Sequence, residues 1–182
     1  MMSEDPELAL IRCAQNGDGQ AFESLVDEYQ GVLYNLALRM TGSSEDARDL
    51  TQTAFMKAWR NLASYDPRHR FYSWIYRITL NESLNFVQRR RRHAELDERI
   101  VATDPLPEDQ ANRSELGEHI QGALMELSIE YRLVIVLRHF HNLSYQEIGE
   151  VLAVPEKTVR SRLFTARRRL GEVLRLRGVG PS

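Results

Sequence analysis

The sequence predicts an all-α protein with two small helical domains, joined by a flexible acidic linker, the C-terminal one a helix-turn-helix domain. Three observations predict this fold. Apolar residues recur with the helical period along most of the chain, and no stretch alternates as a half-buried strand does. Prolines and acids gather in one central stretch. Near the C-terminus, two short helical patterns flank a tight turn. With 182 residues, of which 42% are hydrophobic, each domain can form a modest core.

The N-terminal domain is expected to span residues 1–92 and to contain four helices. Capping residues, prolines and glycines mark where helices begin and end, and apolar stripes mark their buried faces. The first helix should run from Asp5-Pro6 to about Gly17, and the second contains the apolar stripe from Phe22 to Leu36. The third should run from Ser43 to about Leu62. The fourth should begin at about Tyr72, after a loop at 65–70.

The linker is expected to span residues 93–113. Two prolines lie between Asp104 and Asp109, and few apolar residues surround them, which argues against packed structure there. From Glu95 to Glu118 there are eight acids and two arginines, a net charge of -6. The chain is therefore basic on either side of an acidic centre.

The C-terminal domain is expected to span residues 114–182. Two helices should lie near residues 116–127 and 134–140, and Ser144 with Glu147 forms a capping box that begins the next. Val154-Pro155 ends that helix, because a residue before proline disfavours the α region. The last helix buries Val159, Leu163, Ala166 and Leu170. Its opposite face is free to enter a major groove and carries Arg160, Ser161, Phe164, Thr165 and Arg168.

The charge distribution favours a nucleic-acid partner although the net charge is -2. Eight basic residues and one acid lie between Lys157 and Arg177, and seven arginines and one acid lie between Arg68 and Arg92. These segments carry +7 and +6, fields to which phosphates respond.

Composition and motifs argue against several other classes. Cys13 is the only cysteine, so no internal disulfide is expected. The five histidines lack metal-ligand spacing and no phosphate-binding glycine loop occurs, so we expect no metal, no cofactor and no enzymatic activity. No apolar run suits membrane insertion and the start of the chain lacks signal-peptide order, so a cytoplasmic location is expected.

Two further segments join polar and aromatic residues. In Arg68–Arg92, aromatic rings lie among arginines, a combination suited to unpaired bases and their phosphates. The alternative is that Trp74, Ile75, Ile78 and Phe86 are core and that the arginines form a solvated helix end. In Glu45–Leu62, aromatic residues on a polar face suggest a protein contact. The alternative there is ordinary amphipathic packing.

Three motifs resemble bacterial sigma factors of the extracytoplasmic-function (ECF) group, over nearly the whole chain. The motifs are Asp46-Ala-Arg-Asp-Leu-Thr-Gln-Thr-Ala-Phe-Met-Lys-Ala-Trp59, Phe71-Tyr-Ser-Trp-Ile-Tyr-Arg-Ile78, and Leu143-Ser-Tyr-Gln-Glu-Ile-Gly149 with Thr158-Val-Arg-Ser-Arg-Leu163 and Ala166-Arg-Arg-Arg-Leu170. The resemblance implies an initiation factor that binds core RNA polymerase, recognises promoter DNA and helps to melt it. An anti-sigma protein is an implied further partner.

The resemblance also implies roles for individual residues. Polymerase binding falls to Asp49, Gln52, Phe55 and Trp59. Capture of the melted minus-ten strand falls to Arg68, Arg70, Tyr72, Trp74, Tyr76, Arg77 and Asn81. Reading of the minus-thirty-five duplex falls to Arg160, Ser161, Phe164 and Thr165, with Lys157 and Arg168 on its backbone. The chain departs from the group at Glu156-Lys157, Thr165 and Asn85, so no promoter sequence is inferred.

Two other functions remain open on the sequence. A helix-turn-helix repressor or response regulator would act on paired half-sites without polymerase. A helical adaptor for protein interactions would show no salt-dependent DNA binding.

Overall fold

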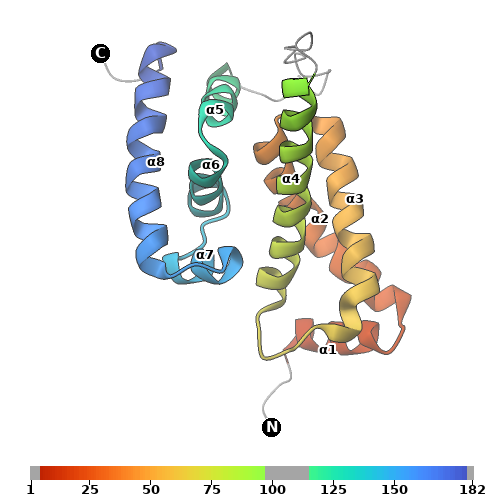
Figure 1. Ribbon diagram of the computed structural model, residues 1–182. Helices are drawn as coiled ribbons and strands as arrows, with labels where there is room; N and C mark the ends of the chain where they lie inside the picture. Colours follow the sequence, from red (N-terminus) through yellow and green to blue (C-terminus); the bar gives the residue numbers. More distant parts are fainter. Residues whose placement is uncertain (1–4, 97–114, 180–182) are drawn as a thin grey trace.

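The computed structural model describes residues 5–96 and 115–179, and within these ranges all regular structure is helical (Figure 1). The predicted all-α fold is therefore confirmed. The linker expected at 93–113 lies largely outside the described residues, but its first part, through Leu96, continues the helix that precedes it. The N-terminal helices are α1 (Pro6–Gln15), α2 (Gly19–Thr41), α3 (Ser44–Asn61), the 3-10 turn η1 (Leu62–Ser64) and α4 (Phe71–Leu96).

Short polar side chains begin the N-terminal helices. Asp5 accepts a hydrogen bond from the backbone N–H of Glu7, and Pro6 follows it in the first turn, as the sequence predicts. Asp18 caps α2 and Ser43 caps α3 in the same manner. α2 ends at Gly42, whose φ of 77° is a left-handed conformation that glycine adopts without strain.

The C-terminal helices are α5 (Glu115–Glu126), α6 (Ile129–Ile135), the π-helical turn η3 (Val136–Phe140), α7 (Tyr145–Leu152) and α8 (Glu156–Leu176). Both halves of the predicted capping box between Ser144 and Glu147 are present. α7 ends at Ala153, and Pro155 is the N-cap of α8. The helix predicted near 134–140 differs from expectation, because it begins at Ile129 and its second half is the π-helical turn.

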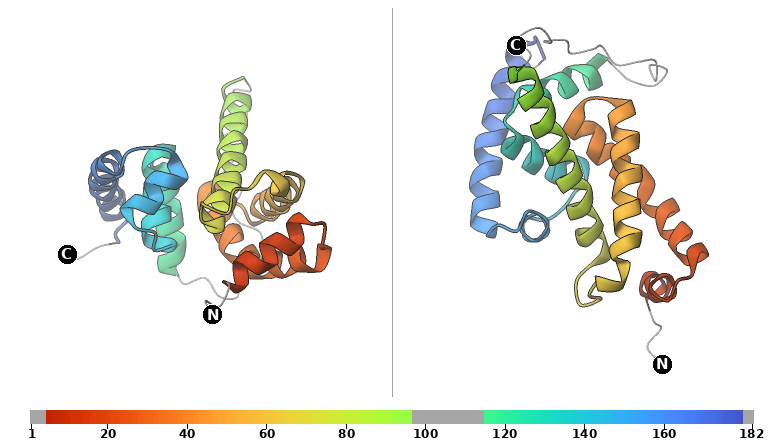
Figure 2. Two further views of the ribbon diagram at one scale, coloured as in Figure 1. Left: turned by 90° about the horizontal axis from the view of Figure 1, so that it is seen from below. Right: turned by 45° about the vertical axis from the view of Figure 1, so that its right-hand side comes forward.

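The two halves pack against each other (Figures 1 and 2). One hydrophobic cluster runs through both, from Ile11 of α1 to Ala166 of α8. α2 contacts α5, α6 and η3, and α4 contacts α7. We call this boundary the seam. α8 contacts α5, α6 and α7 and forms the outer edge of the molecule, drawn in blue.

Arg132 of α6 is a buried cation at the seam, with 4% of its surface exposed. Its guanidinium donates a hydrogen bond of 2.6 Å to the carbonyl oxygen of Met40 in α2. It also donates to the carbonyl oxygens of Leu124, Met125 and Leu127. Those carbonyls lie at helix C-termini, where backbone acceptors lack partners and the helix dipole is negative. Arg132 therefore binds the end of α2 to the end of α5.

Membrane insertion was not expected, and among the described helices none combines the length and apolar character that a membrane span requires.

Candidate nucleic-acid interfaces and apolar groove

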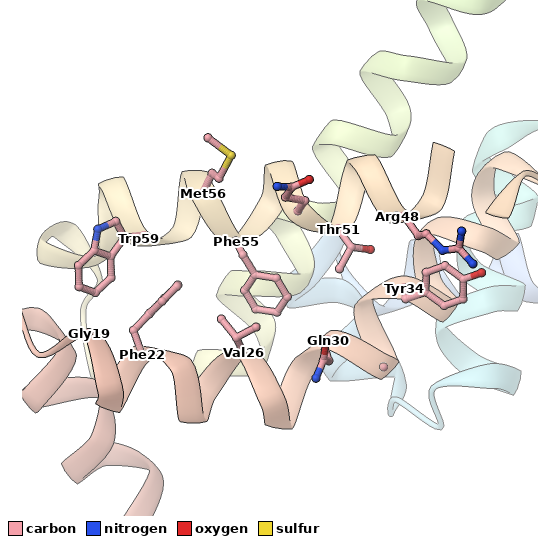
Figure 3. A pocket seen from close by; sticks show the side chains of 12 residues that line it. Gly19, Phe22, Val26, Gln30, Tyr34, Arg48, Thr51, Phe55, Met56 and Trp59 are labelled. Atoms are coloured by element: carbon pink, nitrogen blue, oxygen red, sulfur yellow. The ribbon is translucent and has the colours of Figure 1, made fainter. Parts of the chain in front are cut away.

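An apolar groove of about 920 Å³ lies between α2 and α3 (Figure 3). Phe22 and Val26 of α2 face Phe55 and Trp59 of α3 across it. The rings of Phe22 and Trp59 are 4.8 Å apart between centroids, so they form one aromatic end. Monomeric proteins rarely leave such apolar concavities open unless another molecule binds there. The groove therefore has the character of a protein-binding site.

The four residues predicted to bind polymerase hold different places around this groove. Gln52, Phe55 and Trp59 line it, while Asp49 is exposed on the same helix but is not part of the lining. Trp59 is exposed, as expected. Phe55 is only 7% exposed, so the expectation of an exposed aromatic at that position is wrong. Its ring packs edge-on against Phe22, at 6.4 Å between centroids, and forms the floor of the groove.

The α2 side of the groove is not evident from the sequence. Phe22 and Val26 belong to a stripe with the pattern of ordinary core, and Gly31 and Tyr34, which also line the groove, carry no predicted role. Gly31 is a usable signal, because glycine inside a helix is unfavourable by about 1 kcal/mol relative to alanine. A Cβ at Gly31 would meet no atom within 4 Å, so close packing does not account for this glycine.

The exposed face of α8 carries the residues predicted to bind duplex DNA. Phe164 is 72% exposed on this face, so its ring is accessible to a partner molecule. Val159, Leu163 and Ala166 are buried on the other face, as predicted, whereas Leu170, also predicted there, is only half-buried. The exposed residues of the predicted set are Lys157, Arg160, Ser161, Phe164 and Arg168, and Thr165 is half-buried.

The guanidinium of Arg160 has two close neighbours. Its Nη2 lies 2.5 Å from Oε1 of Glu156, one helical turn earlier. Its guanidinium carbon lies 5.4 Å from the ring centroid of Tyr145 in α7, a cation-π geometry. Arg138 lies 5.2 Å from the same ring. Tyr145 therefore brings two guanidinium groups together at the start of α8, where a helix-turn-helix contacts base edges.

The residues predicted to capture a melted strand are divided by the structure into two groups. Arg68 and Trp74 lie toward the loop before α4: Arg68 forms an ion pair with Asp66, and Trp74 packs against Tyr65 and Phe71. Asn81 is exposed farther along α4. The other four, which contact or face the C-terminal half, are Arg70, Tyr72, Tyr76 and Arg77.

The second group does not form the open aromatic surface that the sequence predicts. Tyr76 is only 6% exposed, and its hydroxyl lies 2.9 Å from Nδ1 of His141. Burial raises the pKa of Tyr76 to about 12, and burial together with Arg39 lowers the pKa of His141 to about 4. Arg70 Nη1 lies 2.9 Å from Oε1 of Glu147. These contacts pack this part of α4 against His141 and α7.

No group of histidine, cysteine or carboxylate side chains within the described ranges has the arrangement of a metal site. Two surfaces are open in this arrangement, an apolar groove on α2 and α3 and a basic and aromatic face on α8, whereas Tyr76 at the start of α4 is buried against the C-terminal half. Contacts of this kind bind and position macromolecules.

Comparisons with known proteins agree with the three motifs. Residues 25–93 match the family model of sigma-70 region 2, and residues 118–170 match that of sigma-70 region 4. The ECF RNA polymerase sigma factor SigW of Bacillus subtilis is 36% identical over 177 residues, which cover 91% of this chain and 95% of SigW.

Solved structures give the same result. CnrH, solved in complex with the cytosolic domain of CnrY, matches with a TM-score of 0.73 and 29% identity over 94% of this chain and 99% of CnrH. The sigma factor RpoE of Bartonella quintana, solved with the anti-sigma factor NepR, matches with a TM-score of 0.70 and 26% identity over 85% of this chain and 96% of RpoE. This chain belongs to the ECF family of RNA polymerase sigma factors.

Proposed function

We propose that this sigma factor binds core RNA polymerase through the α2–α3 groove, recognises promoter duplex with α8, and stabilises the melted strand with the start of α4. The chain acts in the cytoplasm by binding and positioning, without catalysis and without a cofactor. In this assignment residues 1–92 form the domain for polymerase binding and melting, residues 93–113 the linker, and residues 114–182 the domain for upstream recognition.

The groove is the observation that carries this proposal. Its walls are apolar, and it lies between two long helices, a geometry that suits an amphipathic helix laid along it. Gln52 adds a polar group to that lining, and Asp49 lies on the same helix, so a partner helix with complementary polar groups would be oriented as well as bound. A repressor that binds duplex DNA alone has no use for such a surface.

The two DNA surfaces have different chemistry. On α8, Phe164 and Arg160 stand at the helix surface where a major groove admits them, and Lys157 and Arg168 are exposed for phosphates. At the start of α4, arginine and tyrosine side chains suit an unpaired strand, because phosphates bind guanidinium groups and bases stack on rings. We propose an anti-sigma protein as a further partner, on the precedent of the CnrH and RpoE complexes.

The test mixes the full chain with purified core polymerase and measures their co-elution by size-exclusion chromatography. Binding of the mixture to a pool of genomic promoter fragments is then measured. We expect a stable complex with core, and fragment selection only when both are present. Selection of paired half-sites by the chain alone would support the helix-turn-helix regulator instead. Lack of any DNA binding, with or without core, would support the helical adaptor.

A further inference from the structure

α1 lies beside the connection between α3 and α4 (Figures 1 and 2). Its residues precede the segment 25–93 that matches sigma-70 region 2, and the proposed function assigns a role to none of them. Ile11 and Ala14 are buried in the hydrophobic cluster, so α1 is a fixed part of the fold. Its polar contacts reach the connection that leads into α4.

Gln15, the last residue of α1, donates two hydrogen bonds to this connection. Its side-chain Nε2 lies 3.0 Å from the carbonyl oxygen of Leu62 and 3.1 Å from that of Tyr65. Leu62 begins η1 and Tyr65 follows it, so both carbonyls lie directly before residues 66–70, which we call the α3–α4 loop. One amide group therefore fixes the backbone where this loop begins, with both of its N–H donors used.

α1 also supports the far end of the α3–α4 loop. Glu7, in the first turn of α1, accepts a hydrogen bond from the hydroxyl of Tyr29 in α2. The ring of Tyr29 packs edge-on against that of Phe71, with 5.5 Å between centroids. Phe71 is the first residue of α4 and is 1% exposed. The loop is thus held from α1 at both ends, directly by Gln15 and through Tyr29 by Glu7.

Contacts within the α3–α4 loop fix its backbone between these ends. The hydroxyl of Tyr65 donates to the carbonyl oxygen of His69, and the backbone N–H of His69 donates to the carbonyl oxygen of Asp66 at 3.0 Å. The carboxylate of Asp66 accepts from the backbone N–H of Arg68, also at 3.0 Å, as in an Asx turn. Residues 67–70 are nevertheless exposed. The loop is therefore a preformed turn that faces solvent.

A preformed, exposed turn suits the reading of an unpaired base. Such a base is read by hydrogen bonds to its edge, and the groups that make them must be held to within about 0.5 Å of the productive geometry. The α3–α4 loop leads directly into the start of α4, the surface proposed for the melted strand. Because the position of the loop decides which base fits beside it, a residue that positions the loop acts on sequence preference.

We infer that α1 positions the α3–α4 loop for base reading, and that Gln15 is the positioning residue. Gln15 contacts no DNA in this inference, because it acts through the carbonyls of Leu62 and Tyr65. The inference rests on the proposed function, since it assigns a support to the surface proposed there for the strand. It adds to that surface a helix outside the region 2 match.

The test uses the full chain with core polymerase and a random-sequence pool of single-stranded DNA. Gln15→Leu removes both donors and keeps the approximate size of the side chain. Gln15→Lys is the rescue variant, because an ammonium group again offers several N–H donors to the two carbonyls. Gln20→Leu is the matched control, since Gln20 is exposed at the start of α2.

Tyr65→Phe tests the same loop without changing α1. It removes the hydroxyl that donates to His69 and keeps the buried ring. If Gln15→Leu does not fold, the comparison of Tyr65→Phe with the parent decides the outcome.

Bound strands are sequenced, and the enrichment of each base is compared position by position, with core alone as background. Unfolded chains bind no strand, so a role in stability alone lowers the recovery of all sequences and leaves the ratios between bases unchanged. We expect Gln15→Leu to reduce the preference for the favoured base at least about fivefold, as expected for a misplaced base contact. Tyr65→Phe should reduce the preference at the same position. Gln15→Lys and Gln20→Leu should keep it, and co-elution with core should be unchanged in every variant.

The inference is overturned if Gln15→Leu keeps the base preference of the parent, or if it lowers the recovery of all sequences by one common factor. Loss of preference in Gln20→Leu as well would overturn it too. Failure of the proposed function has a different signature, because the parent with core would then enrich no sequence beyond core alone.

Discussion

The hydroxyl of Tyr76 lies 2.9 Å from Nδ1 of His141, and this hydrogen bond joins α4 to the residue that follows η3 across the seam. The imidazole is buried, and Arg39 of α2 adds a positive charge nearby. Both effects disfavour the protonated ring, so the pKa of His141 falls from its ordinary 6.5 to about 4.

Acid should therefore weaken the folded structure. The unfolded chain binds a proton at His141 below about pH 6.5, whereas the folded chain does so only near pH 4. Between these values the group lowers the free energy of unfolding by up to about 1.4 kcal/mol for each pH unit of acidification. Urea unfolding at several pH values measures this slope. His141→Gln should flatten it relative to the parent, whereas His69→Gln, at an exposed position, should not.

Arg132→Met should destabilise the fold strongly. The substitution leaves four carbonyl oxygens without their shared donor, in Met40, Leu124, Met125 and Leu127. The expected loss in free energy of unfolding is about 3 kcal/mol, measured by chemical denaturation. Arg162→Met, which breaks an ion pair with an exposed carboxylate, is the control and should cost under about 1 kcal/mol. Equal losses in the two variants would contradict the bridging role of Arg132.

Gly31→Trp should weaken binding to core polymerase and leave the fold intact. A side chain at Gly31 has open space around its Cβ and enters the groove, where it fills the volume meant for a partner. We expect affinity for core to fall at least about tenfold, equivalent to about 1.4 kcal/mol, with an unchanged circular-dichroism melting curve. Gly171→Trp is the matched control, because Gly171 lies in α8 with equally open space. Unchanged affinity in Gly31→Trp would exclude the groove as the polymerase site.

Arg160→Ala and Arg168→Ala should separate base reading from phosphate contact. Arg160 lies at the start of α8 and is held by Glu156 and Tyr145, so its loss should cost roughly 1–3 kcal/mol on the preferred upstream sequence and little on others. Arg168 lies two turns later. Its loss should weaken binding to all DNA sequences alike, and it should reduce the salt dependence of DNA binding by about one phosphate contact. Competition binding of the holoenzyme to a library of DNA duplexes distinguishes the two patterns. If Arg160→Ala lowers affinity equally for all sequences, Arg160 contacts phosphate and does not read bases.

The sequence is sufficient for features set by local interactions. The capping residues Asp5, Ser43 and Ser144 begin helices where they were expected to, because a cap needs only its own backbone neighbours. The period of Val159, Leu163 and Ala166 likewise identifies the buried face of α8. The opposite face follows from geometry alone, so the predicted duplex residues are mostly exposed.

Features set by packing between distant helices are not accessible in the same way. Helical spacing places Tyr76 near Tyr72 and Arg77. It does not reveal that His141 and α7 contact them, since these follow more than sixty residues later. The sequence predicts Phe22 as a core residue of one helix and Phe55 as an exposed aromatic of another, and only the arrangement of α2 beside α3 makes them parts of one groove. Arg132 gives no sequence signal, because its partners are backbone carbonyls.

If this chain directs polymerase to start sites, transcription from a genomic library should depend on it. Purified core polymerase is supplied with the chain or without it, and the 5′ ends of the products are sequenced. We predict a discrete set of start sites that requires the chain, is lost with Gly31→Trp and persists with Gly171→Trp. If the chain yields no new start sites and also fails to co-elute with core, it does not act as an initiation factor.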